Sequence, residues 1–456
     1  MGKKKKNNDL GLLHGFNKLI NQIFLPPSEN SSKIAKFLCS PYLKLSIFLL
    51  ISISFFSTLF HYMTEELGRA PSNHFVYQAQ AFLNGNVDLP RYMHDLAVFN
   101  DRYYVIFPPF PTLLLLPFVA LFGINVSLIF ISSVMTIVGA VALIKIFIKL
   151  NIEKRFIPWL VIAFFWGTGY WYALFRSEGV CYFAHVCAVI TMLLALNECL
   201  GKGRGWLVGA FLGMAFLSRQ LSVYFVIFFI IALWNNINYN IEQQKTIPFS
   251  RSKKRLVTLL SNYRKNKEKY LNIFKFLFAF GLCGIIYLTY NWMRFGDIFQ
   301  TGYSFLNLAG FMKERVDMYG EFSIRYIPFN FYHMFIKGFN IHFDGSMLLT
   351  FRELDGFGTA LTIASPFVLI SVWAKMKKGL LVAAWLSLII TITHQLMYYN
   401  NGWVQHNNQR FSLDFLPMLI ILVALATKKV PEKYWKPLIV FSVILNLISY
   451  RFLPTW

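Results

Sequence analysis

Val126–Leu150 reads VSLIFISSVMTIVGAVALIKIFIKL, an apolar run in which the only charged residues are Lys145 and Lys149. A helix of about 20 such residues crosses the hydrocarbon core of a bilayer. We expect about eleven such spans, at residues 43–63, 126–150, 156–175, 180–200, 205–218, 221–236, 271–293, 357–374, 379–398, 411–426 and 435–453. The fifth and sixth are short, and we expect them to form one tight hairpin. The chain is therefore predicted to be an all-α polytopic membrane protein.

The composition agrees with this fold class and argues against nucleic-acid binding. Of 456 residues, 56% are hydrophobic and 14% are charged, whereas a soluble domain usually has about 25% charged residues. The formal net charge is +23, but the eleven spans place 31 of the 44 Lys and Arg on one side, with 7 of the 21 Asp and Glu. Basic loops mark the cytoplasmic side and contact anionic lipids. We expect a plasma-membrane protein with a cytoplasmic amino terminus.

The chain divides into a basic cytoplasmic segment at 1–42 and a single transmembrane domain at 43–456. No compact apolar segment with a cleavage site follows the MGKKKK start, so we expect the first span to be uncleaved. The domain has three outer loops, at 64–125, 294–356 and 398–410. A basic cytoplasmic loop covers 237–270, and its stretch 251–269 fits either an amphipathic helix on the inner leaflet or an ordinary linker.

The first outer loop contains two segments expected at the membrane interface. In NHFVYQAQAFLNGN (residues 73–86), the apolar residues recur with helical spacing, and Gly85 is a plausible helix stop. After its proline cluster, the segment Phe107–Gly123 has only about 12 apolar residues, which is short for a span. We therefore expect it to lie along the outer leaflet as an interfacial or re-entrant helix.

Several motifs recur in an order that resembles the GT-C membrane glycosyltransferases. They are NHFVYQAQAFLNGNVDL (73–89), HDLAVFNDRYYVIFPPFPTLLLLPFVALFG (94–123), AFLSRQ (215–220), YNWMRFGDIFQTGY (290–303) and QRFSLDFLP (409–417). The chain is most similar to the bacterial family 39-like group. Its superfamily includes protein O-mannosyltransferases, aminoarabinose transferases and galacturonosyltransferase-like enzymes.

The resemblance implies an inverting hexosyl- or pentosyltransferase. Such an enzyme moves a sugar from a polyprenyl-phosphate donor to a glycan, lipid or protein acceptor on the outer face. No cofactor is implied; a divalent cation would fit the chemistry, although no ligand cluster in the sequence indicates one. The alternatives are a lipid-linked polysaccharide polymerase or ligase, a multi-pass transporter and a non-catalytic scaffold. We see no internal repeat that would favour the transporter.

In the resembling enzymes, an acidic residue of the first outer loop acts as general base or positions the acceptor. The Asp-Glu pair of the mannosyltransferases corresponds here to Asn73 and His74, and an asparagine cannot act as a base. We expect Asp95 to take this role, with Glu65 and Glu66 as alternatives. Any of these carboxylates could instead cap a helix or face water.

Cations near the outer surface are expected to bind the phosphate of the donor. Arg219 interrupts two apolar runs, which favours an anion or a polar cavity as its partner, although it could instead snorkel to the interface. Arg410 could pair with Asp414, four residues later. The further substrate-binding candidates, some of which could be ordinary polar contacts, are Asn73, His74, Glu178, His185 and Arg294.

Overall fold

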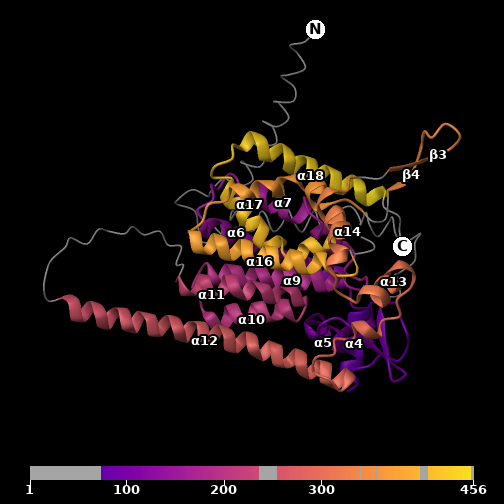
Figure 1. The fold of residues 1–456 in the computed structure, drawn as a ribbon, viewed down its shortest axis with the longest axis horizontal. Coiled ribbons are helices and arrows are strands. Elements are labelled where there is room, and N and C mark those ends of the chain that lie inside the picture. The colour runs from indigo at the N-terminus through magenta and orange to yellow at the C-terminus, as the bar shows by residue number, and fades with distance from the viewer. Residues whose placement is uncertain (1–72, 236–253, 339–340, 355–357, 401–408, 453–456) are drawn as a thin grey trace, which may run out of the picture.

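The computed structural model describes residues 73–235, 254–338, 341–354, 358–400 and 409–452 (Figure 1). These residues are predominantly helical, and their strands form only two antiparallel hairpins. Four helices are long and apolar enough to cross a membrane: α6 (Leu128–Lys149), α9 (Tyr182–Cys199), the part Asn266–Phe295 of α12 (Lys254–Phe295) and α16 (Lys378–Leu396). The chain therefore has the helices expected of a membrane protein.

The other predicted spans are shorter or interrupted in the structure, so a count of eleven is not confirmed. The predicted span 156–175 divides after Gly167, and 357–374 divides at Ser365, where a 3-10 helix begins with Pro366. The first predicted span, 43–63, lies outside the described residues. The remaining helices of the bundle are α7 (Ile157–Trp166), α8 (Tyr170–Phe175), α10 (Gly205–Phe216), η3 (Gln220–Phe225), α11 (Val226–Trp234), α15 (Leu361–Ala364), η7 (Pro366–Trp373), η8 (Arg410–Asp414), α17 (Leu416–Ala426) and α18 (Glu432–Phe452).

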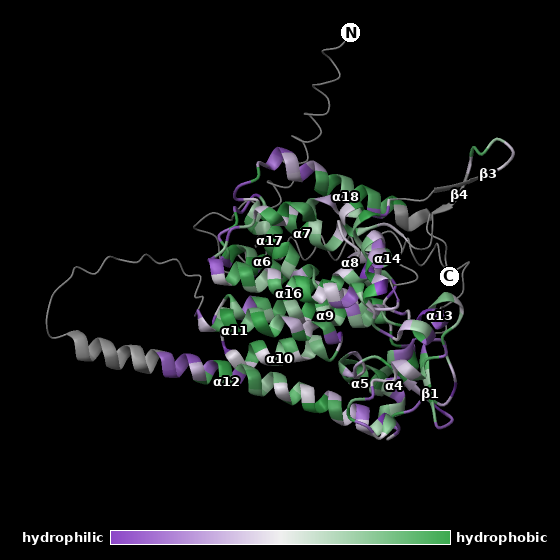
Figure 2. Ribbon diagram, viewed as in Figure 1, coloured by the Kyte–Doolittle hydropathy of each residue, from purple (hydrophilic) through white to green (hydrophobic). Residues whose placement is uncertain are grey.

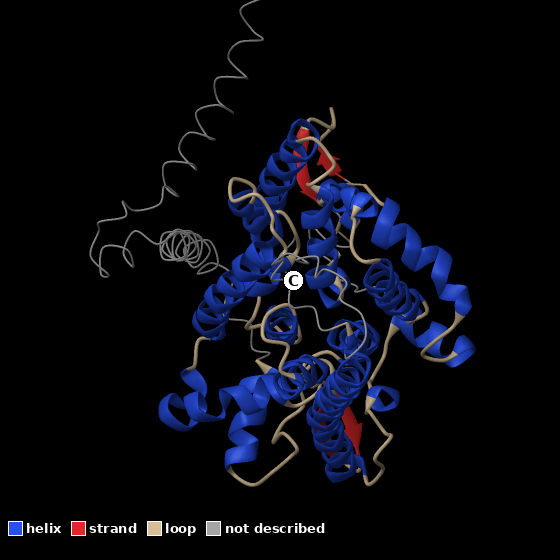
Figure 3. Cartoon of the chain, turned by 90° about the vertical axis from the view of Figure 1, so that its left-hand side faces the viewer, coloured by secondary structure: helices blue, strands red, loops and turns tan. Residues whose placement is uncertain are grey.

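The long helices of the bundle run roughly side by side, and Figure 3 shows several of them nearly end-on. At one end, which we call the loop face, lie α4 (His74–Leu83), α5 (Phe110–Phe122), the hairpin of β1 (Leu96–Phe99) and β2 (Arg102–Val105), α13 (Gly310–Tyr319) and α14 (Ile327–Phe331) (Figures 1 and 2). Hydrophilic turns gather at the opposite end (Figure 2), which we call the basic face. Its turns contain Lys154, Arg155, Lys202, Arg204, Lys375, Lys377, Lys378, Lys428 and Lys429. The predicted grouping of basic turns at one end is therefore present.

The first helix of the first loop is built as its apolar pattern predicts. The helix α4 (His74–Leu83) buries Phe75, Val76 and Ala79. It ends before Gly85, whose φ of +77° is a backbone conformation that glycine adopts without strain. The strands β1 (Leu96–Phe99) and β2 (Arg102–Val105) then form an antiparallel hairpin. They lead into α5 (Phe110–Phe122) and η2 (Gly123–Asn125), and α5 packs against α4.

The helix α12 continues without a break from its apolar part into the basic stretch, and Figure 1 shows it extending beyond the bundle at the basic face. The sequence allowed residues 251–269 to be either an amphipathic helix on the inner leaflet or an ordinary linker. The structure shows a helix from Lys254 onward, and this helix continues in line with the apolar part of α12. α12 packs closely on α10, where a Cβ on Gly209 would overlap the backbone carbonyl of Phe276. Glycines allow such close contacts between helix backbones.

The second outer segment consists of short elements on the loop face. They are η4 (Tyr303–Phe305), α13 (Gly310–Tyr319), η5 (Ile324–Tyr326), α14 (Ile327–Phe331), a π-helical turn η6 (Tyr332–Ile336), β3 (Ile341–Asp344) and β4 (Thr350–Leu354). The backbone of Leu306 forms an isolated bridge with Ala97 in β1, and Phe322 forms one with Tyr398 after α16. These two bridges bring the three outer segments together at the loop face.

Candidate functional site

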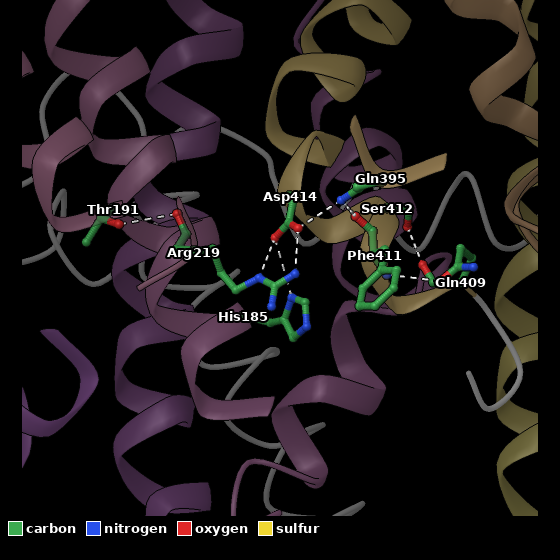
Figure 4. Close-up of polar contacts among 9 residues, drawn as sticks. His185, Thr191, Arg219, Gln395, Gln409, Phe411, Ser412 and Asp414 are labelled. Atoms are coloured by element: carbon green, nitrogen blue, oxygen red, sulfur yellow. Dashed lines mark hydrogen bonds and ion pairs between the residues drawn. The ribbon is translucent and has the colours of Figure 1, made fainter. Parts of the chain in front are cut away.

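A buried carboxylate, Asp414, organises the polar residues near the loop face. Asp414 ends η8 and is 4% exposed. Arg219 donates two hydrogen bonds to it, from Nε to Oδ1 at 2.9 Å and from a terminal nitrogen to Oδ2 at 2.7 Å. Gln395, at the end of α16, donates a third at 2.8 Å. Two segments, one of them 195 residues away in the sequence, therefore converge on one carboxylate (Figure 4).

The sequence suggested an anion or a polar cavity as the partner of Arg219, and in the structure the guanidinium pairs with an anion of the chain itself, the Asp414 carboxylate. The side chain of Arg219 is 15% exposed, and its guanidinium forms a bidentate ion pair with Asp414. Bidentate pairing is the strong geometry for an arginine and a carboxylate. Arg219 therefore does not simply snorkel to the interface. Asp414 pairs with Arg219 rather than with Arg410, the partner four residues away that the sequence suggested. The helical period of that suggestion does not apply because residues 410–414 form a 3-10 helix.

His185 lies in the first turn of α9, next to this pair. It is fully buried, and its Nδ1 is 3.7 Å from an oxygen of Asp414, which is beyond hydrogen-bond range. Within the described part of the chain, neither ring nitrogen has a hydrogen-bond partner. Buried polar groups are nearly always hydrogen-bonded, so an exception of this kind calls for an explanation. A ligand or an ordered water near Asp414 would satisfy the ring.

Arg410 provides a second cation, and it has no carboxylate partner among the described residues. A terminal nitrogen donates a long hydrogen bond of 3.4 Å to the Tyr182 hydroxyl, and the buried Nε has no partner. The ring of Phe411 is close to both guanidinium groups, with its centroid 5.4 Å from the guanidinium carbon of Arg410 and 5.7 Å from that of Arg219. Two cations thus contact one aromatic ring, and among the described residues Asp414 is the carboxylate that pairs with one of them.

The amino-terminal end of α9 adds further positive potential. The cap residue, Cys181, makes no side-chain hydrogen bond to the first turn, and the first turn contains no acidic residue. The first amides of a helix point outward and carry about half a positive charge in total. Because Tyr182 touches Arg410, this helix end lies against the cation. The cluster of Arg410, Arg219, His185 and the α9 terminus is therefore suited to an anion.

Three neighbouring tyrosines, Tyr303, Tyr398 and Tyr399, connect this cluster to the outer loops, and we call them the tyrosine wall. Burial raises the pKa of the Tyr303 hydroxyl, and the nearby Arg219 guanidinium partly offsets that rise. The ring of Tyr303 is 6.3 Å from that of Tyr398, which is 4.5 Å from that of Tyr399. Burial raises the pKa of Tyr399, and the carboxylate of Asp95 raises it further. Asp95 is thus close enough to Tyr399 to act on its hydroxyl electrostatically.

Asp95 stands at the start of the β1–β2 hairpin. Its φ of +64° is in the left-handed region, which aspartate tolerates better than most residues. The side chain is 47% exposed and lies 3.3 Å from Nε2 of His94. His74, which is buried in α4, holds this loop through a 2.6 Å hydrogen bond between its Nε2 and the carbonyl oxygen of His94. The structure thus gives His74 a role in positioning Asp95.

Arg294 is set apart from the cluster and joins the first loop to α12. It is 2% exposed, donates to the carbonyl oxygen of Val105 at 2.5 Å and to Asn291 at 2.6 Å, and stacks 3.8 Å from the ring of Tyr290. The Tyr290 hydroxyl accepts a hydrogen bond from Gln78 in α4. These contacts indicate a residue that anchors the loop, whereas the sequence suggested substrate binding.

The other predicted site residues are placed as follows. Asn73 caps α4, accepting a hydrogen bond from the amide of Val76 at 3.4 Å, which is the structural role expected of an asparagine there. Glu178 lies in the turn between α8 and α9, four residues before Tyr182, and is half-exposed. Glu65 and Glu66 lie outside the described residues. Across the described residues, no group of three or more His, Cys, Asp or Glu side chains could hold a metal.

Sequence reasoning did not assign Gln395 or Tyr399 to the site, nor Glu321, whose backbone carbonyl oxygen accepts a hydrogen bond from the amide of Tyr399. Gln395 could have been noticed, because a polar residue in an apolar helix usually faces the bundle interior. Glu321 has no such signal, since it lies among other charged residues of a long loop. The chain matches no protein-family model, no curated protein and no solved structure. The similarity to GT-C glycosyltransferases therefore stays a prediction.

Proposed function

We propose that the protein is a membrane glycosyltransferase that moves a sugar from a polyprenyl-phosphate donor to an acceptor at the loop face. The observation that carries this proposal is the uncompensated positive charge around Arg410. Arg410 is half-buried with a buried Nε, and a cation in such a place is costly unless a carboxylate or another anion balances it. The phosphate of a lipid-linked donor has the right charge, and it would enter at the depth where apolar helices give way to polar loops.

The chemistry of the transfer uses such a cation. A polyprenyl-phosphate sugar is a phosphodiester with one negative charge, and the departing polyprenyl phosphate gains a second as the sugar–oxygen bond breaks. Arg410, the edge of Arg219 and the α9 terminus would stabilise this growing charge more strongly in the transition state than in the ground state. Asp414 would hold Arg219 in a fixed orientation, which avoids reorganisation during the reaction.

The remaining parts of the proposal concern the acceptor and the topology. We assign the proton of the acceptor hydroxyl to Asp95, as the resemblance to GT-C enzymes suggests. The loop face would be the outer face of the plasma membrane, because the basic face has the turns typical of a cytoplasmic side. In this arrangement the amino terminus is cytoplasmic, and about eleven spans, including 43–63, form a GT-C-like bundle.

The test uses the purified full chain in lipid nanodiscs with a panel of polyprenyl-phosphate sugars. We expect wild-type protein to bind one of them and to release polyprenyl phosphate. Arg410→Ala should weaken binding and turnover at least tenfold, and Arg410→Lys should restore only part, since lysine lacks the planar fork. Arg325→Ala is the matched control, because Arg325 is an exposed arginine of the loop face that donates to Tyr319. Donor handling that is unchanged in Arg410→Ala would contradict the proposal.

A further inference from the structure

A second carboxylate, Glu321, lies beside the tyrosine wall. The amide of Tyr399 donates a hydrogen bond to the carbonyl oxygen of Glu321 at 3.0 Å. The amide of Ser323 donates one to the carbonyl oxygen of Met397 at 2.8 Å. Between them, Phe322 pairs with Tyr398 as an isolated bridge, and their rings are 5.4 Å apart. The backbone of Glu321 is therefore fixed against the end of α16 by hydrogen bonds on both sides.

The side chain of Glu321 is half-buried and lacks an ionic partner among the described residues. Burial raises the pKa of its carboxyl, and no neighbouring cation offsets the rise. The carboxylate also acts on Tyr399, whose pKa both Glu321 and Asp95 raise. Two carboxylates from different outer segments, one from the β1–β2 hairpin and one from the turn after α13, thus act electrostatically on Tyr399, and the backbone of Glu321 bonds to it directly.

Their surroundings match the chemistry of a sugar ring. Carboxylates accept hydrogen bonds from hydroxyl groups, and tyrosine rings offer flat apolar faces to the CH groups of a sugar. Tyr303, Tyr398 and Tyr399 continue from these carboxylates to the Arg219–Arg410 cluster. An acceptor held at Asp95 and Glu321 would therefore face a donor whose phosphate lies at Arg410.

We propose that Glu321 binds the acceptor, and that the acceptor is a carbohydrate which offers Glu321 a hydroxyl next to the one that reacts. This inference rests on the proposed transferase function. In the step itself, the reacting hydroxyl oxygen forms a bond to the sugar's anomeric carbon, its proton passes to Asp95, and the electron pair of the broken bond leaves with polyprenyl phosphate. Glu321 takes no proton; it fixes the acceptor's orientation.

The experiment measures transfer to a panel of short-chain alkyl glycosides, to their monodeoxy analogues and to a serine-containing peptide. Donor binding is measured separately in the same nanodiscs. Glu321→Gln should raise the acceptor KM about tenfold or more, the effect of losing a hydrogen bond to a charged group, while kcat and donor affinity stay within about twofold. Glu314→Gln is the control, because Glu314 is an exposed carboxylate on the neighbouring α13.

A structural role for Glu321 would not reproduce one further result. Wild-type protein should discriminate against the deoxy analogue that lacks the neighbouring hydroxyl, and Glu321→Gln should lose that discrimination. An unchanged acceptor KM in Glu321→Gln, or transfer to the peptide but to no glycoside, overturns the inference and leaves the transferase proposal standing. If wild-type protein neither binds nor cleaves any donor, the proposed function fails and the inference fails with it.

Discussion

Asp414→Asn tests whether the polar cluster is held together by one buried carboxylate. The substitution keeps the size of the side chain but removes the charge that faces Arg219 at 2.7 and 2.9 Å. Arg219 then stays in place with a side chain that is only 15% exposed and without an ionic partner. Removing one partner of a buried ion pair typically costs about 3–5 kcal/mol, because the other charge remains buried.

We expect Asp414→Asn to lower the free energy of unfolding by about 3 kcal/mol, the lower end of that range, since Arg219 keeps some contact with solvent. Arg219→Met should also destabilise the protein. The double variant should lose less than the sum of the two, by up to about 3 kcal/mol, because it leaves no unpaired cation at this position. The assay is reversible unfolding in mixed detergent micelles, followed by circular dichroism.

The matched control is Asp317→Asn, which removes an exposed carboxylate paired with Lys313 on α13. Exposed pairs of this kind contribute about 0–1 kcal/mol, so the control should unfold almost as wild type does. A loss below about 1 kcal/mol for Asp414→Asn would refute the reasoning, as would two single effects that simply add. Either result would mean that Arg219 finds another partner or reaches water.

Three further predictions concern packing, catalysis and pH. Gly209→Ala should destabilise the protein by at least about 1 kcal/mol in the same unfolding assay, because the added Cβ would overlap the Phe276 carbonyl. Gly281→Ala is the control: its Cβ would meet no atom within 4 Å, so this variant should be neutral or slightly stabilised. Asp95→Asn should lower turnover by roughly 10²–10⁴ with donor affinity kept, and near-full turnover would show that another group takes the proton. Burial raises the pKa of Glu321 above its unfolded value, so ionisation opposes folding as the pH rises. Glu321→Gln should therefore unfold no earlier than wild type at pH 7, and any gain should shrink towards pH 4; a loss of stability at pH 7 would indicate a structural role.

The sequence correctly predicted a mainly helical chain with helices long enough to cross a membrane, the buried face of α4 and the grouping of basic turns at one end. Each follows from local properties: the length of an apolar run, its helical period and the position of charges between runs. It also singled out Arg219, Arg410 and His185, because polar groups next to apolar helices need partners. None of these conclusions required knowing which segments meet in space.

The partners of these residues became apparent from the three-dimensional structure. Asp414 is 195 positions from Arg219 along the chain, and the suggested pairing with Arg410 was wrong because residues 410–414 form a 3-10 helix. Arg294 likewise anchors the first loop through the carbonyl of Val105, a contact that no local pattern predicts. Ion pairs and loop contacts of this range depend on how whole helices pack, so the composition of a site is a property of the assembled bundle.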